Sequence, residues 1–212
     1  MEQKANSQIY PLVMTAVMAA VISAVAPFAL PIGPIPITLG TLVMYLAGYV
    51  LGGERAGAAV LVYVLLGAVG VPVFNGFTGG LGVVAGPTGG YIVGFIPMAF
   101  LSGLCVERFP KNRVLQLVGM IAATAVLYAL GTAWFCLQAG KSLAAALSVC
   151  VFPFIPGDLA KMAVALILGP MLRERMVQAL SLIHIWWPRR SRARPRCREP
   201  DPIPGQWSCP PR

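Results

Sequence analysis

The chain has 212 residues, of which 58% are hydrophobic and 11% are charged, and its mean hydropathy is +0.77. This balance excludes a water-soluble globular protein, because too few polar side chains remain to cover a folded surface. The formal net charge of +9 would suggest nucleic-acid binding only if it were a property of the whole chain. Residues 1–179 hold nine basic and five acidic side chains, and residues 180–212 hold seven and two. More than half of the excess therefore comes from the C-terminal segment, and we predict no nucleic-acid partner.

Six apolar stretches within residues 1–179 predict helices that cross a lipid bilayer. They cover approximately residues 10–30, 37–53, 56–71, 88–106, 114–138 and 157–173. The first stretch contains Ala24-Val25-Ala26, as a signal-peptide cleavage site would, but it is long and further spans follow, so we predict an uncleaved helix. Residues 143–155 are also apolar and end among prolines, which is compatible with a seventh, re-entrant or surface-lying segment.

Positive charges predict the orientation of this bundle. Six spans place seven basic residues on one side, namely Lys4, Arg55, Arg108, Lys111, Arg113, Arg173 and Arg175. The loops on the other side carry only Lys141, so by the positive-inside rule both termini are cytoplasmic. The outer loops, at 26–38, 70–90 and 152–158, are rich in Gly and Pro. Irregular backbone at membrane depth persists only around protein or a water-filled cavity, so these loops predict a ligand pocket at the outer face.

Asp158 and Lys161 are the ionisable residues inside the predicted spans. Their i, i+3 spacing places both on one helix face, and charge inside a membrane usually serves a function. One interpretation is a mutually satisfied structural pair in which Asp158 caps the helix. The other is a binding pair whose carboxylate and ammonium groups match a cyclic urea, which has N–H donors and a carbonyl acceptor. Asn75, in FNGFTGG, is either an Asn-Gly turn residue or a further ligand contact.

The segment GPTGGY, residues 86–91, could complete the site. Its adjacent glycines, Gly89 and Gly90, allow the backbone after Thr88 to approach a ligand closely. Tyr91 adds an apolar ring with a polar tip. Glycines also recur here at every fourth residue, which is typical of close helix packing, and both interpretations can hold together.

Small residues at four-residue spacing, Ala16, Ala20 and Ala24, form a stripe on the first predicted helix. Such a stripe can arise by chance in an alanine-rich helix, but it also suits docking against another membrane protein. The sequence shows no ATPase motif and no chain of buried carboxylates or histidines, so a partner would have to drive any transport. No catalytic residue, metal ligand set or cofactor motif is predicted. The alternative function, an intramembrane enzyme acting on a lipid or prenyl substrate, would require acidic metal ligands or a nucleophile–base pair.

The C-terminal segment has a different character from the rest of the chain. From Trp186 it carries three of the four Trp and seven of the 19 Pro residues and shows no hydrophobic period. It could be a disordered basic arm that binds anionic lipid or nucleic acid. We favour an artefact of sequence assembly over residues 180–212, because LSLIHI at 180–185 is what a transposon end sequence used in sequencing-library adapters encodes.

Three segments resemble the BioY family, the biotin-specific S components of energy-coupling factor (ECF) transporters. They are PIPITLGTL at 34–42, GVPVFNGFTGGLGVVAGPTGGYIVGF at 70–95 and PGDLAKM at 156–162. The resemblance covers about residues 9–177 and implies an all-α, six-transmembrane-helix S-component bundle in a prokaryotic plasma membrane. Family members end shortly after the last helix, so residues 180–212 depart from the pattern.

The resemblance also implies ligand and partners. The ureido ring of biotin, a transported ligand rather than a cofactor, would contact Asn75, Asp158 and Lys161, while Tyr91 and the backbone of residues 88–90 would line the site. The first-helix alanines would contact the transmembrane coupling subunit, and two cytoplasmic ATPase subunits would complete the transporter. The biotin carboxylate has no evident basic partner, which leaves backbone N–H groups or the hydroxyls of Thr38 and Thr78 as candidates.

Overall fold

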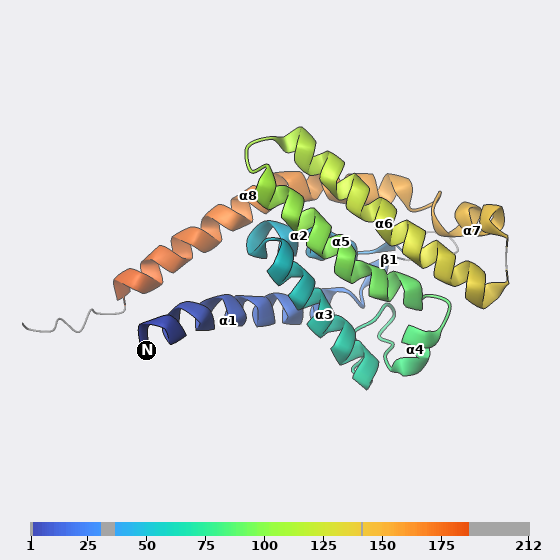
Figure 1. The fold of residues 1–212 in the computed structure, drawn as a ribbon, viewed down its shortest axis with the longest axis horizontal. Helices are drawn as coiled ribbons and strands as arrows, with labels where there is room; N and C mark the ends of the chain where they lie inside the picture. The colour runs from blue at the N-terminus through green and yellow to red at the C-terminus, as the bar shows by residue number, and fades with distance from the viewer. Residues whose placement is uncertain (1, 31–36, 141, 187–212) are drawn as a thin grey trace, which may run out of the picture. The chain divides into compact units, whose positions relative to one another are not determined.

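A computed structural model describes residues 2–30, 37–140 and 142–186, and these residues are mostly helical (Figure 1). The helices are α1 (Glu2–Val25), α2 (Gly40–Leu51), α3 (Gly53–Val69), α4 (Leu81–Ala85), α5 (Gly89–Arg108), α6 (Arg113–Ala139), α7 (Leu143–Cys150) and α8 (Ile155–Trp186). Two short strands, β1 (Ala29–Leu30) and β2 (Ile37–Thr38), pair antiparallel with Ala29 opposite Thr38. The chain divides into two compact units, Met1–Arg175 and Met176–Arg212, and the first contains the bundle.

Each of the six predicted helical stretches is helical in the structure, with different ends. α1 stops at Val25 rather than at residue 30, and the chain then turns into β1. α8 continues through Trp186, so residues 180–186, which we assigned to the tail, are helical; their sequence has no Pro or Gly to end the helix. α4 was not predicted, and α7 occupies the first part of the extra apolar segment. Lys141 and the tail from residue 187 lie outside the described residues.

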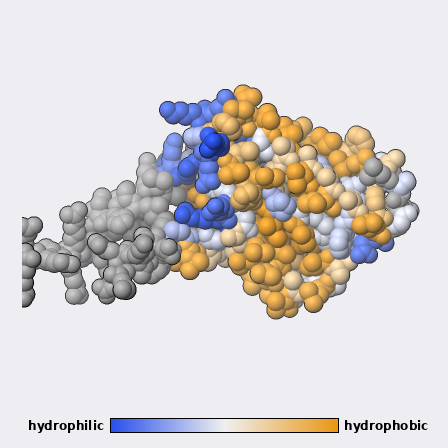
Figure 2. All heavy atoms as spheres, viewed as in Figure 1, coloured by the Kyte–Doolittle hydropathy of each residue, from blue (hydrophilic) through white to orange (hydrophobic). Residues whose placement is uncertain are grey.

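Three of the described helices are long and apolar enough to cross a membrane: α5, α6 and the Ile155–Arg175 part of α8. Pro11–Val25 of α1 and α2 are shorter apolar helices. Large hydrophobic side chains are exposed along the bundle, including Leu65 of α3 and Ile167 of α8. Figure 2 shows hydrophobic residues over most of one face. A surface of this kind suits contact with lipid chains rather than water.

α5 packs against α2, α3 and α6, and α3 also packs against α1 (Figure 1). A glycine crossing brings α5 close to the turn between α2 and α3. A Cβ atom at Gly103 would lie only 2.8 Å from the Cα atom of Gly53, and one at Gly48 would lie 3.1 Å from the Cα atom of Gly103. Small residues thus let the helix backbones meet, which is how membrane helices gain packing energy.

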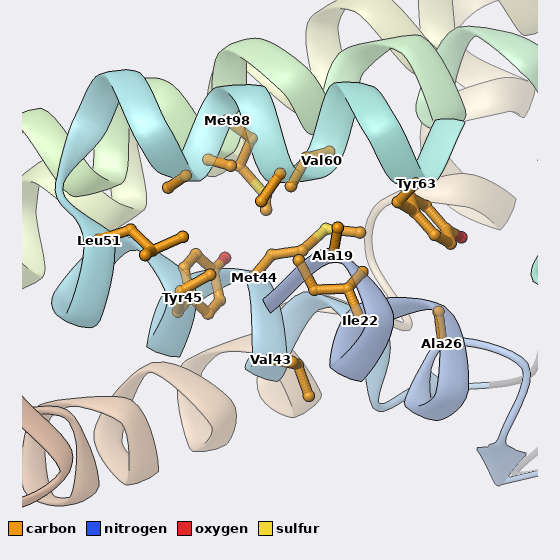
Figure 3. Close-up of a cluster of buried hydrophobic side chains, with 14 of the residues drawn as sticks. Ala19, Ile22, Ala26, Val43, Met44, Tyr45, Leu51, Val60, Tyr63 and Met98 are labelled. Carbon is orange, nitrogen blue, oxygen red and sulfur yellow. The ribbon is translucent and has the colours of Figure 1, made fainter. Parts of the chain in front are cut away.

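The core gathers apolar side chains from four helices, as Figure 3 shows. Ile22 of α1 meets Met44 of α2, and Val60 of α3 and Met98 of α5 lie beside them; all four are fully buried. Close packing between these side chains contributes more dispersion energy than looser contacts with lipid chains would. The core therefore fixes α2 and α3 beneath the outer loops, where the candidate site lies.

The two ends of the bundle differ in chemistry. At one end the turns α2–α3 and α5–α6 expose Arg55, Arg108, Lys111 and Arg113. These turns are joined there, since the backbone N–H of Gly53 donates to Glu107 Oε2 at 3.2 Å. Hydrophilic residues gather at this end in Figure 2. Four of the seven charges that we predicted on one side, Arg55, Arg108, Lys111 and Arg113, therefore lie in or beside two turns that are in contact.

Loops rich in Gly and Pro meet at the other end. The N–H of Gly76, after α3, donates to the carbonyl of Pro27, after α1, at 3.1 Å. The rings of Phe28 and Phe77 pack edge to face with centroids 5.4 Å apart. The indole N–H of Trp134 near the end of α6 donates to the carbonyl of Gly86 at 2.9 Å. These contacts tie the loop after α1 to the loop after α3, and the turn after α4 to α6.

Candidate ligand-binding site

A cavity of about 410 Å³ lies among α2, α3, α5, α6 and α8 and beneath the outer loops. Its polar lining residues are Thr38, Thr41, Asn75, Thr78, Thr88, Asp158 and Lys161, and its aromatic ones are Tyr63, Phe74, Tyr91, Phe95, Tyr128, Phe135 and Phe154. A mostly apolar chamber with a few converging polar groups is typical of a small-molecule site. This volume suits a ligand of vitamin size.

The charged centre of the cavity is the Asp158–Lys161 pair in the first turns of α8. Lys161 Nζ donates to Asp158 Oδ1 at 2.9 Å, and the two residues are only 6% and 8% exposed. The carboxylate contacts Lys161 and Tyr128 in the described structure, with no backbone N–H among its partners. The pair is thus mutually satisfied, as the structural interpretation required, but Asp158 lies inside α8 and does not cap it. The pair also lines the cavity, as the binding interpretation required.

Two residues from other helices hold this pair. The Tyr128 hydroxyl of α6 donates to Asp158 Oδ2 at 2.5 Å. Lys161 Nζ also donates to Thr41 Oγ1 of α2 at 3.0 Å, and Thr41 is 6% exposed. Sequence reasoning missed both residues. Tyr128 gave a weak signal, since it is a tyrosine within the apolar run of α6. Thr41 gave no signal except that it lies in the segment PIPITLGTL, which resembles the BioY family.

Asn75 lies in a tight turn between α3 and α4. The backbone N–H of Phe74 donates to the carbonyl of Thr78, and Thr78 Oγ1 donates to the carbonyl of Asn75 at 3.0 Å. Gly76 and Phe77 have positive φ angles of 69° and 58°, which such a reversal requires. Asn75 is therefore a turn residue, and it also lines the cavity.

The GPTGGY segment divides between the cavity and the helix packing. Thr88 and Tyr91 line the cavity, and the Tyr91 hydroxyl pairs with Thr132 Oγ1 at 3.2 Å. Gly89 and Gly90 are buried and do not line the cavity. A Cβ atom at Gly89 would collide with the carbonyl of Val84, and one at Gly90 would collide with Trp134. Their place in the fold is close packing between α4, α5 and α6.

A model of the BioY family matches residues 1–178. The chain belongs to the BioY family. Among curated relatives, a biotin transporter BioY of Thermotoga maritima is 39% identical over 168 residues, which cover 79% of this chain and 98% of the relative. One of Rhizobium etli is 41% identical over 169 residues, covering 74% of this chain and 90% of the relative.

A solved structure agrees with this BioY assignment at the level of the fold. It is described as the S-component for biotin from an ECF-type ABC transporter, at 2.1 Å. The two chains are 27% identical and superpose with a TM-score of 0.72, over 80% of this chain and 93% of the other. The site described above therefore lies in a fold shared with a biotin S component.

Other predicted features of this BioY-family chain lie away from the cavity. Ala16, Ala20 and Ala24 are exposed on α1, whereas Ala19 and Ile22 face the core. The alanine stripe is thus on the outer surface of the bundle, available to a partner or to lipid. Among the described residues, no group of three His, Cys, Asp or Glu side chains could hold a metal ion.

Proposed function

We propose that this chain is the biotin-binding subunit of an ECF-type vitamin uptake transporter. The observation that carries the proposal is the buried Asp158–Lys161 pair, which lines the cavity in a BioY-family chain. The relatives are named as biotin transporters, and the matched structure as an S-component for biotin. The chain is a membrane transport subunit rather than an enzyme, and nothing supports the lipid- or prenyl-modifying alternative.

The pair suits the ureido ring of biotin chemically. A carboxylate has about four lone-pair positions, and the contacts with Lys161 and Tyr128 use two, so Asp158 can accept ligand N–H groups. An ammonium group has three N–H donors, of which Asp158 and Thr41 use two, so Lys161 can donate to the ligand carbonyl. Asn75 would add a donor and an acceptor from the loop between α3 and α4.

The rest of the cavity suits the apolar body of biotin. Tyr91, Phe95 and Phe135 supply ring faces for the thiolane and the valeryl chain. Thr38 and Thr78, which line the same cavity, are our candidates for the carboxylate, together with the backbone of Thr88, which lines it as well. Buried Gly89 and Gly90 would then act through the position they give to Thr88 and Tyr91 rather than by facing the ligand.

We propose six membrane crossings with both termini in the cytoplasm of a prokaryotic cell. The positively charged turns at one end of the bundle support this orientation. The ligand cavity then opens toward the outer face. Exposed Ala16, Ala20 and Ala24 would contact the transmembrane coupling subunit, and two cytoplasmic ATPase subunits would supply energy. The family model ends at residue 178, which supports our view that residues 180–212 have no role in transport; sequencing the locus from unfragmented DNA would test that view.

Uptake of labelled biotin tests the function. Cells that lack their own biotin importer would express the full chain together with an ECF coupling subunit and ATPases. We expect accumulation of biotin above the level of empty cells, and its loss in the Asp158→Asn variant at equal membrane abundance. Accumulation that does not differ from empty cells, with the protein present in the membrane and a known S component active in parallel, would refute the transport role.

A further inference from the structure

The Asp158–Lys161 pair belongs to a chain of four side chains that joins three helices. Thr41 of α2, Lys161 and Asp158 of α8 and Tyr128 of α6 are linked by hydrogen bonds of 3.0, 2.9 and 2.5 Å. Thr41 and Tyr128 are separated from their partners by 120 and 30 residues along the chain. The two outer members therefore fix the pair through tertiary structure, not through helix geometry.

Each outer member restrains one charged group. Without Tyr128, Asp158 Oδ2 would lose its partner, and the carboxylate could rotate so that both oxygens turn toward Lys161. Without Thr41, the ammonium group would lose the acceptor that holds it toward α2. Lys and Asp side chains otherwise sample several rotamers, and fixing them before the ligand arrives lowers the entropic cost of binding.

A second cavity explains why the Tyr128 contact matters. This space of about 220 Å³ lies between α6 and α8, and Tyr128 and Asp158 line it as well as the first cavity. Its other lining residues are apolar except Thr124, whose hydroxyl already bonds Tyr45 and the carbonyl of Met120. Among the described residues around this space, the Tyr128 hydroxyl is thus the donor that keeps the carboxylate between the two cavities in a single orientation.

We propose that Tyr128 and Thr41 are positioning residues that preorganise the Asp158–Lys161 pair for ligand. The proposal rests on the proposed biotin-binding function, which it extends to two residues that act through the pair. Their loss should weaken binding without unfolding the bundle. We expect about a tenfold loss for each, the size of one hydrogen bond to a charged group.

The test is an equilibrium titration of the purified full chain with labelled biotin. Tyr128→Phe and Thr41→Val should each bind about tenfold more weakly than the parent chain. Thr41→Ser, which keeps the hydroxyl but is smaller, should bind within about twofold of the parent. Tyr49→Phe is the matched control, because it removes a buried hydroxyl that bonds Gln116 Oε1 at 2.9 Å and lines neither cavity.

Infrared spectroscopy separates positioning from packing. The carboxylate band that disappears in Asp158→Asn should shift in Tyr128→Phe and stay in place in Tyr49→Phe. An unshifted band, parent-like affinity in Tyr128→Phe, or a Thr41→Val variant that binds better than Thr41→Ser would overturn the proposal. If the parent chain binds no biotin, both the proposed function and this inference are rejected. If the parent chain binds biotin and the Tyr128→Phe and Thr41→Val variants bind it equally well, only the inference is rejected.

Discussion

Replacing Lys161 with Met tests how much the buried ion pair contributes to the free energy of folding and how much to ligand binding. The substitution keeps the length of the side chain but removes the ammonium group, leaving the carboxylate of Asp158, 6% exposed, with the Tyr128 hydroxyl. Removing one partner of a buried ion pair costs about 3–5 kcal/mol of folding free energy, because the other charge remains buried. The midpoint of thermal unfolding in detergent should therefore fall clearly.

The double variant Asp158→Leu, Lys161→Met separates the two effects. It removes both charges, so most of the lost stability should return, since apolar replacements of buried pairs are often neutral or stabilising. Biotin binding should not return. Loss of one hydrogen bond from a charged group to the ligand corresponds to about 10- to 150-fold in affinity, measured by equilibrium dialysis. A Lys161→Met variant with parent-like unfolding and parent-like affinity would refute the reasoning.

Three further predictions concern other parts of the molecule. Asn75→Ala should lower biotin affinity about tenfold while thermal unfolding changes little, because the turn rests on backbone contacts around Thr78; equal affinity in an equilibrium titration would contradict the assigned contact. Gly103→Val should lower the unfolding midpoint, at a cost of about 1–3 kcal/mol or more, since its Cβ would lie 2.8 Å from backbone that cannot rotate away; an unchanged midpoint would argue against the glycine crossing. Ala20→Trp, on the exposed face of α1, should leave biotin binding by the isolated chain intact but abolish uptake with the coupling subunit; uptake at the parent rate would exclude this face as the docking surface.

The sequence predicted those site residues whose side chains are unusual in an apolar segment. Asp158 and Lys161 could be singled out because charge is rare in apolar helices and because i, i+3 spacing puts both on one face. Asn75 and Tyr91 were found through the loop composition, and both line the cavity with the charged pair. The apolar stretches likewise predicted the helices, since their composition is set by the lipid environment.

Other features depended on contacts between distant segments. Thr41 lies 120 residues from Lys161, and nothing in its local sequence distinguishes it from a threonine that merely packs. The glycines of GPTGGY could face a ligand or a helix, and only the position of Trp134 in α6 shows that Gly90 packs against a helix. The end of α8 at Trp186 also differs from the prediction, because a change in composition at residue 180 does not by itself end a helix.

Direct binding of biotin to the purified full chain tests the central claim. A titration with labelled biotin should show saturable binding that excess dethiobiotin, which keeps the ureido ring, competes away. Asp158→Asn should weaken it at least tenfold, while Lys111→Ala, which removes an exposed cation from the α5–α6 turn, should not. Absence of saturable binding, or equal affinity in the parent and Asp158→Asn proteins, would contradict the assignment of this cavity as the biotin site.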